Sequence, residues 1–193
     1  LGSFRIEHKQ PDEGVPLVRQ ASAWLDANRP DGDAKALVAR SVLAYGLEDQ
    51  GDLDGAERLL RALLQTQERL GGPGAPDTFA PRNNLAMLLM KRGRLDEALR
   101  EFEVLDAQVR ARLGADHPFA AIFASNRGEC LGKLGRFEEA RHVLEESLAR
   151  LQAKFGRTHE RTLKAADRLM AVYGAMGIAT RAADLRREFP PAA

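Results

Sequence analysis

Apolar residues along most of the chain recur at the three-and-four spacing of amphipathic helices, in segments separated by Gly and Pro. Between residues 15 and 27, for example, they fall at Leu17, Val18, Ala21, Trp24 and Leu25. The sequence contains no segment with the strict apolar and polar alternation of a half-buried strand. The pattern therefore predicts a protein built from helices alone.

A short motif that starts with Gly and ends with Ala five residues later recurs every 42 residues, at 51–56, 93–98, 135–140 and 177–182. Each Gly follows a helical segment and precedes another, so we expect it to end the first helix with positive φ. The Ala falls where two helices would cross, and its small side chain allows a close approach. Each repeat is therefore predicted to be a helical hairpin.

The links between hairpins keep the same register, at 72–77, 114–118 and 156–160. Residues 1–12 have no sustained period and are interpreted as a loose arm or a cloning remnant. The predicted organisation is this arm, an incomplete first repeat at 13–29, a four-hairpin array at 34–189 with units 34–76, 77–118, 119–160 and 161–189, and a tail at 190–193.

Residues 113–118, Asn126, the 135–140 motif and Leu144 closely resemble the kinesin-light-chain type of tetratricopeptide repeat, a 42-residue variant, and 83–86 is similar to its first-helix core. The resemblance implies an all-α, right-handed superhelical solenoid of stacked antiparallel hairpins, with first helices lining the concave wall. It also implies protein binding. Arrays of this type are similar to the tails of bacterial multidomain proteins such as receptor-like kinases.

The composition of the chain argues against several kinds of partner and site. With 29 basic and 28 acidic residues, no overall field attracts nucleic acid or a membrane surface. The longest apolar run, at 85–90, is too short to span a bilayer. The single cysteine, Cys130, excludes an internal disulfide framework and a multi-thiolate metal site. We expect a cytoplasmic protein.

Catalytic chemistry finds no support in the sequence. The four histidines, His8, His117, His142 and His159, show no metal-ligand or nucleophile spacing, and no strand precedes a Gly-rich phosphate loop. We therefore predict no enzyme activity, no catalytic or metal-binding residues and no cofactor.

The candidate ligand-binding residues lie on the first helices, and three of them, Asn84, Asn126 and Arg168, occupy the same repeat position. An Asn inside a helix carries a propensity cost, so recurrence suggests a role for the amide. That role is a hydrogen bond between helices or, as the resemblance implies, bidentate bonding to an extended peptide; both remain open. The full set of groove candidates is Asn83, Asn84, Met87, Met90, Asn126, Lys164 and Arg168.

Lys164 and Arg168 lie four residues apart and so share a helix face. Together with Asn126 they partly resemble the carboxylate clamp of chaperone-binding tetratricopeptide proteins, which favours an acidic segment or chain end as the ligand. A solvated cation pair, neutralised by Asp167, is the alternative. The sequence thus predicts a protein- or peptide-binding scaffold or regulatory module, or alternatively a self-associating structural segment. Partner identity and oligomeric state stay open.

Overall fold

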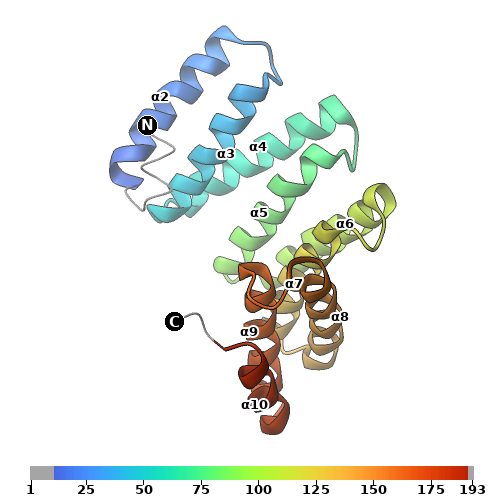
Figure 1. The fold of residues 1–193 in the computed structure, drawn as a ribbon. Helices are drawn as coiled ribbons and strands as arrows, with labels where there is room; N and C mark the ends of the chain where they lie inside the picture. Colours follow the sequence, from blue (N-terminus) through green and yellow to red (C-terminus); the bar gives the residue numbers. More distant parts are fainter. Residues whose placement is uncertain (1–10, 191–193) are drawn as a thin grey trace. The chain divides into compact units, whose positions relative to one another are not determined.

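The computed structural model of the chain describes residues 11–190, and every regular element within them is helical (Figure 1). The described part of the chain therefore confirms the all-α class. Two compact units divide the chain, residues 1–93 and residues 94–193. Each unit is built from helices that follow one another in sequence.

Unit 1 contains four α-helices and one 3₁₀ turn among its described residues. They are α2 (Pro11–Asn28), α3 (Ala34–Asp49), α4 (Leu53–Gly71), η1 (Pro76–Thr78) and α5 (Phe79–Lys91). Helix α2 packs on α3, α3 on α4, and α4 on α5. The buried side chains between them are mainly leucines, including Leu43, Leu47, Leu60 and Leu63.

Unit 2 contains five helices among its described residues. They are α6 (Leu95–Leu113), α7 (Pro118–Lys133), α8 (Phe137–Phe155), α9 (Glu160–Ala175) and α10 (Ala179–Glu188). Each helix packs on the next, and α7 also contacts α9. The first helices of two successive hairpins, α7 and α9, therefore present side chains to a common surface.

The glycines of the repeat motif have the backbone conformation expected from the sequence. Their φ angles are 84° at Gly51, 75° at Gly93, 77° at Gly135 and 74° at Gly177. A side chain with a Cβ is strained in this region, whereas Gly adopts it freely. The predicted turn chemistry is confirmed at all four positions.

The alanines of the motif are buried in three of the four repeats. Ala56, Ala98 and Ala140 have no exposed surface, which fits a close approach of two helices. Ala182 is half-buried and lies on α10, a helix without a single fully buried residue. Helix α10 therefore buries less of its surface than α4, α6 and α8.

The beginning of α2 differs from the sequence prediction. We expected a loose arm at residues 1–12 and a helix only from residue 13, but α2 starts at Pro11 and contains Pro16. Proline is tolerated at a first helical position, and Pro16 forfeits only one backbone hydrogen bond near the start of the helix. Burial of Val15 and Val18 stabilises the helix across that position. Residues 11 and 12 are thus helical, and residues 1–10 of the expected arm lie outside the described residues.

Candidate functional site

The candidate residues lie on α5 in unit 1 and on α7 and α9 in unit 2. A ligand can reach only groups that other side chains leave accessible. The exposure of these residues and the contacts of their polar atoms therefore decide what they could bind.

In unit 1, α5 exposes Asn84, while Asn83 and Met87 are half-buried. The Asn83 amide nitrogen donates a hydrogen bond to the Asn84 side-chain oxygen at 3.3 Å. Met90 is only 7% exposed and packs in the core. Three of the four candidates on α5 are therefore accessible, and Met90 is a core residue.

The sequence reasoning missed an exposed aromatic residue on the neighbouring first helix. Tyr45 of α3 stands 42 residues before Met87, at the equivalent repeat position, and its side chain is largely exposed. Val38 lies two helical turns earlier on the same face of α3 and is also exposed. An ion pair of 3.1 Å between Lys91 and Glu48 joins α5 to α3 near this surface. The 42-residue offset from Met87 is the signal that identifies Tyr45.

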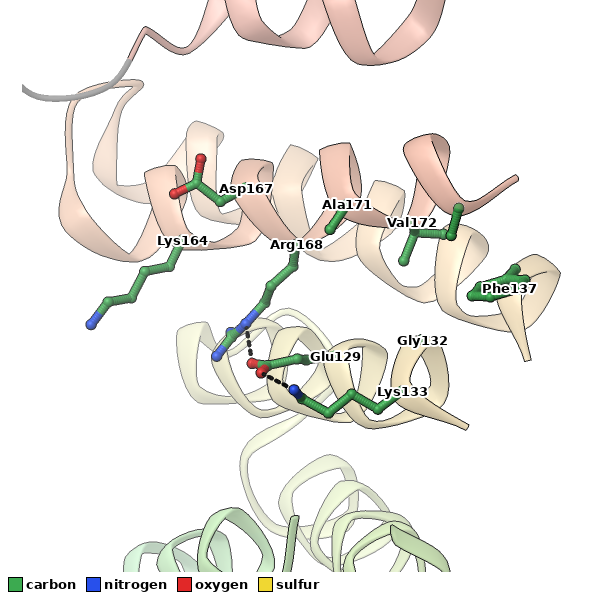
Figure 2. A pocket seen from close by; sticks show the side chains of 10 residues that line it. Glu129, Gly132, Lys133, Phe137, Lys164, Asp167, Arg168, Ala171 and Val172 are labelled. Carbon is green, nitrogen blue, oxygen red and sulfur yellow. Dashed lines mark hydrogen bonds and ion pairs between the residues drawn. The ribbon is translucent and has the colours of Figure 1, made fainter. Parts of the chain in front are cut away.

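Unit 2 carries a cavity of about 540 Å³ between α7 and α9 (Figure 2). Apolar groups line one part of it, namely Phe137, Ala171, Val172 and Ala175. Charged groups line the remainder, namely Glu129, Lys133, Lys164, Asp167 and Arg168. We call this cavity the α7/α9 groove. It combines an apolar wall with polar groups that could orient a ligand.

Arg168 is held in place from α7. Its Nε donates to Oε2 of Glu129 at 2.7 Å, and its Nη1 donates to the hydroxyl of Ser125 at 2.9 Å (Figure 2 draws the contact to Glu129). Lys133 adds a second cation, 3.8 Å from the other carboxylate oxygen of Glu129. The Arg168 side chain is 18% exposed, so it is positioned in advance and still partly accessible.

The other charges of the groove are arranged differently from the expectation. Lys164 is exposed and forms an ion pair of 2.6 Å with Glu160, and the hydrogen bond from Lys164 lowers the pKa of the Glu160 carboxyl. Asp167, which the alternative interpretation named as the neutralising charge, points away from Arg168 in Figure 2. The residue that pairs with Arg168 is Glu129, from the preceding repeat.

Asn126 is only 8% exposed. It lies on α7, which packs against α6, α8 and α9. The side chains of α7 that meet Arg168 are its neighbours Ser125 and Glu129. Little of Asn126 is therefore accessible to a ligand.

Glu129 could have been found from the repeat register. It stands 42 residues after Met87 and at the same repeat position, and the sequence analysis singled out Met87 alone. The residues at this repeat position in the four first helices are thus Tyr45, Met87, Glu129 and Ala171. The same point of the first helix changes from apolar in unit 1 to acidic on α7.

Groups with potential for catalysis have structural roles in the described residues. His117 and His159 cap α7 and α9, each accepting a backbone N–H through Nδ1 at 3.2 Å. Cys130 is buried, and burial, followed by the charges of Glu129 and Asp96, raises the pKa of its thiol to about 11. A thiol with such a pKa is a poor nucleophile near neutral pH.

Two further surveys of residues 11–190 bear on function. This part of the chain holds no group of three His, Cys, Asp or Glu side chains arranged to bind a metal ion. Nor does it include a helix with both the length and the apolarity needed to cross a bilayer.

These helices and their hairpin register define a helical repeat protein. A family model for the tetratricopeptide repeat matches residues 34–105 and 79–153, which together cover more than half of the chain. The chain therefore belongs to the tetratricopeptide repeat family, a fold that generally serves protein–protein interaction. A search of curated proteins gives no match.

Solved structures with the same fold include kinesin-light-chain-like proteins. A putative kinesin light chain with nearly identical TPR-like repeats from Podosopora anserina has a TM-score of 0.81 at 24% identity, covering 98% of this chain and 89% of that one. BtubC (BKLC) from P. vanneervenii has a TM-score of 0.79 at 19% identity, covering 100% of this chain and 80% of that one. A Rap protein complexed with Competence and Sporulation Factor has a TM-score of 0.76 at 15% identity, covering 98% of this chain and 53% of that one. These likenesses establish the kinesin-light-chain-like repeat fold predicted from the sequence.

Proposed function

We propose that this chain is a protein-interaction module that binds an extended peptide segment along its first helices. The observation that carries the proposal is the α7/α9 groove, which places an accessible, pre-positioned guanidinium beside an apolar wall. A peptide needs both features, because apolar side chains supply affinity and polar contacts fix its register. The similarity to a Rap protein complexed with Competence and Sporulation Factor supports a binding role.

Unit 1, taken by itself, carries a separate candidate surface for a peptide. Asn84 is exposed there, with Met87 and Tyr45 at equivalent positions of adjacent first helices. An exposed Asn can bond to both the N–H and the C=O of a peptide backbone. Met and Tyr would accept apolar side chains, Met because its thioether is flexible and polarisable.

A modest preference for acidic segments belongs to the proposal. Arg168 already binds one carboxylate, that of Glu129, through a charge-assisted hydrogen bond from Nε, while its Nη1 donates to Ser125. A carboxylate of the ligand would share or replace that partner, so the net gain is smaller than for an unpaired arginine. Glu129 is therefore an internal competitor for the site, and its removal should strengthen the binding of acidic peptides.

The test uses three fluorescein-labelled peptides of one length, with Leu throughout except at every third position, which holds Glu, Gln or Lys. That spacing follows from an extended chain rise of ~3.3 Å per residue and first helices about 10 Å apart. Fluorescence anisotropy at low salt measures affinity for the full chain. We expect the Glu peptide to bind more tightly than the Lys peptide, and Arg168→Ala to weaken the Glu peptide about tenfold.

Two further variants make the result specific to the groove. Glu129→Gln should tighten binding of the Glu peptide, because it removes the competing carboxylate. Arg161→Ala removes the same charge from an exposed position on α9 that does not line the groove. Equal losses of affinity in Arg161→Ala and Arg168→Ala would mean that binding follows overall charge, and the groove would be rejected as the site.

We also infer that the module is cytoplasmic and has no catalytic activity of its own. Repeat scaffolds of this family are generally non-enzymatic. The unpaired, buried state of Cys130 is compatible with a reducing compartment. Fractionation of cells that produce the chain, followed by immunodetection, tests the location.

A further inference from the structure

Small residues border the apolar end of the α7/α9 groove on both helices. Gly132 of α7 lines the groove, and a Cβ added to it would stand 3.2 Å from Cγ2 of the buried Val172 on α9. Phe137 and Ala175 complete the lining at this end. We call this set of four residues the Gly132 subsite: Gly132, Phe137, Val172 and Ala175. Figure 2 shows Gly132, Phe137 and Val172 at one end of the groove and Lys164 at the other.

The repeat register shows which side chains are missing at the subsite. The position of Gly132 holds Glu48 on α3 and Met90 on α5, and α9 repeats the glycine at Gly174. The first helices before α9 also carry longer side chains at the position of Ala175. These are Asp49, Lys91 and Lys133. The groove is therefore open at this end because two positions that hold long side chains in unit 1 hold Gly132 and Ala175 here.

We propose that the Gly132 subsite anchors one large apolar side chain of the bound peptide, such as Leu, and that Gly132 determines this preference. The inference rests on the proposed peptide-binding function and names a residue preference within it. The groove has a volume of about 540 Å³, within the range of ~300–1,000 Å³ typical of ligand sites. A Leu side chain beside Phe137 would bury apolar surface on both partners, whereas an Ala side chain would leave most of the subsite unfilled.

The charges of the groove favour a peptide that also carries an acidic residue. The charged lining residues are three cations, Lys133, Lys164 and Arg168, and two carboxylates, Glu129 and Asp167. The cations exceed the carboxylates by one, so a ligand with an acidic group complements the groove.

Helix geometry gives the spacing between the acidic residue and the anchor. Val172 follows Arg168 by four residues on α9, which is a rise of ~6 Å along the helix. Two residues of an extended peptide advance about 6.6 Å, and their side chains point to the same side. We therefore expect the anchor two residues from an acidic residue.

Fluorescence anisotropy of the full chain with two labelled peptides tests the proposal. Both peptides carry the core X-Gln-Glu-Gln-X within a host of Ser and Gln, and X is Leu in one and Ala in the other. Because X stands on both sides of Glu, the core covers both peptide directions, and the two peptides have the same charge. We expect the Leu peptide to bind at least about tenfold more tightly than the Ala peptide, since Leu buries more apolar area.

Three variants make the result specific to the subsite. Gly132→Met places on α7 the side chain that α5 carries at this position, and by filling the subsite it should reduce the ratio of the two affinities to within about twofold. Ala175→Met fills the subsite from an exposed position on α9, so it decides the result if circular dichroism shows that Gly132→Met impairs folding. The matched control is Ala149→Met, at an exposed alanine of α8 that does not line the groove, and it should leave the ratio unchanged.

Equal affinities of the Leu and Ala peptides for the wild-type chain would overturn the proposal. So would a ratio that is unchanged in Ala175→Met and in folded Gly132→Met, and so would an equal loss of the ratio in Ala149→Met. If both peptides bind equally and Arg168→Ala weakens both, the proposed peptide binding stands and the anchor subsite fails; if neither peptide binds, both fail. A sedimentation coefficient that rises with concentration for the wild-type chain but not for Gly132→Met would assign the subsite to a second copy and would also overturn the proposal.

Discussion

Gly128 offers the sharpest test of how closely the hairpin helices pack. It lies inside α7 and is buried against α8. A Cβ added at Gly128 would stand 2.5 Å from Cγ and 2.7 Å from Cδ2 of Leu144, a leucine with no exposed surface. Rotation about χ2 does not move Cγ, and a change of χ1 would have to fit a fully packed core, so the clash is costly to relieve.

Two opposing effects determine the stability of Gly128→Ala. Replacing Gly by Ala inside a helix stabilises by roughly 0.5–1 kcal/mol, because Ala loses less backbone entropy. Overpacking a well-packed core costs about 1–3 kcal/mol. With the contact at Cγ of Leu144, we expect the packing cost to dominate and the free energy of unfolding to fall by roughly 0.5–2 kcal/mol.

Urea unfolding followed by circular dichroism measures the change in the free energy of unfolding. Unfolding midpoints are compared only between variants whose free energies depend on urea concentration with the same slope, because repeat arrays can depart from two-state behaviour. Gly174→Ala on α9 is the control, because a Cβ there meets nothing within 4 Å and should stabilise by roughly 0.5–1 kcal/mol. In a Leu144→Ala background, Gly128→Ala should also stabilise. A stabilising Gly128→Ala in the wild-type chain would refute the reasoning.

Two further predictions concern α8 and α9. Ala140→Leu should lower the free energy of unfolding by about 1–3 kcal/mol, because Ala140 is fully buried. Ala149→Leu, at an exposed position of the same helix, should leave the melting temperature nearly unchanged. Equal melting temperatures of the two variants would contradict the close packing of α8 at Ala140. Burial, and then the hydrogen bond to Glu145, raise the pKa of Tyr173 to about 12. The protonated Tyr173 side chain therefore contributes to the stability of the fold below the ordinary tyrosine pKa of about 10, and this contribution is lost as the pH rises toward 12. Absorbance titration of Tyr45→Phe, in which Tyr173 is the remaining tyrosine, should give a midpoint near 12 while the chain is folded, and a midpoint near 10 would contradict the contact.

The helical hairpins could be predicted because their signals are local. A glycine such as Gly135 ends a helix through its own φ angle, and its recurrence every 42 residues separates this signal from chance. The start of α2 could not be read in the same way. Pro16 is locally unfavourable inside a helix, and packing of Val15 and Val18 on α3 outweighs that preference.

The candidate site was less predictable, because its contacts join residues that are far apart in the sequence. The sequence placed Lys164 and Arg168 on one face correctly, since an i, i+4 relation is fixed by helix geometry. Its alternative interpretation named Asp167, an adjacent residue, as the neutralising charge, whereas the structure pairs Arg168 with Glu129, which is 39 residues away. A pairing of this kind depends on how α7 and α9 pack, which local spacing does not determine.

One repeat position illustrates why shared register does not imply shared function. Asn84, Asn126 and Arg168 occupy it on successive first helices, yet Asn84 is exposed, Asn126 is 8% exposed and Arg168 is held by Ser125 and Glu129. The repeat fixes the backbone position of each residue, and the neighbouring side chains decide how much of it a ligand can reach. A propensity cost borne by a recurrent Asn is therefore compatible with a structural role at Asn126 and with ligand contact at Asn84. The side chains around each of these residues determine whether a ligand can reach it. Substitutions at equivalent positions are therefore expected to have different effects on binding.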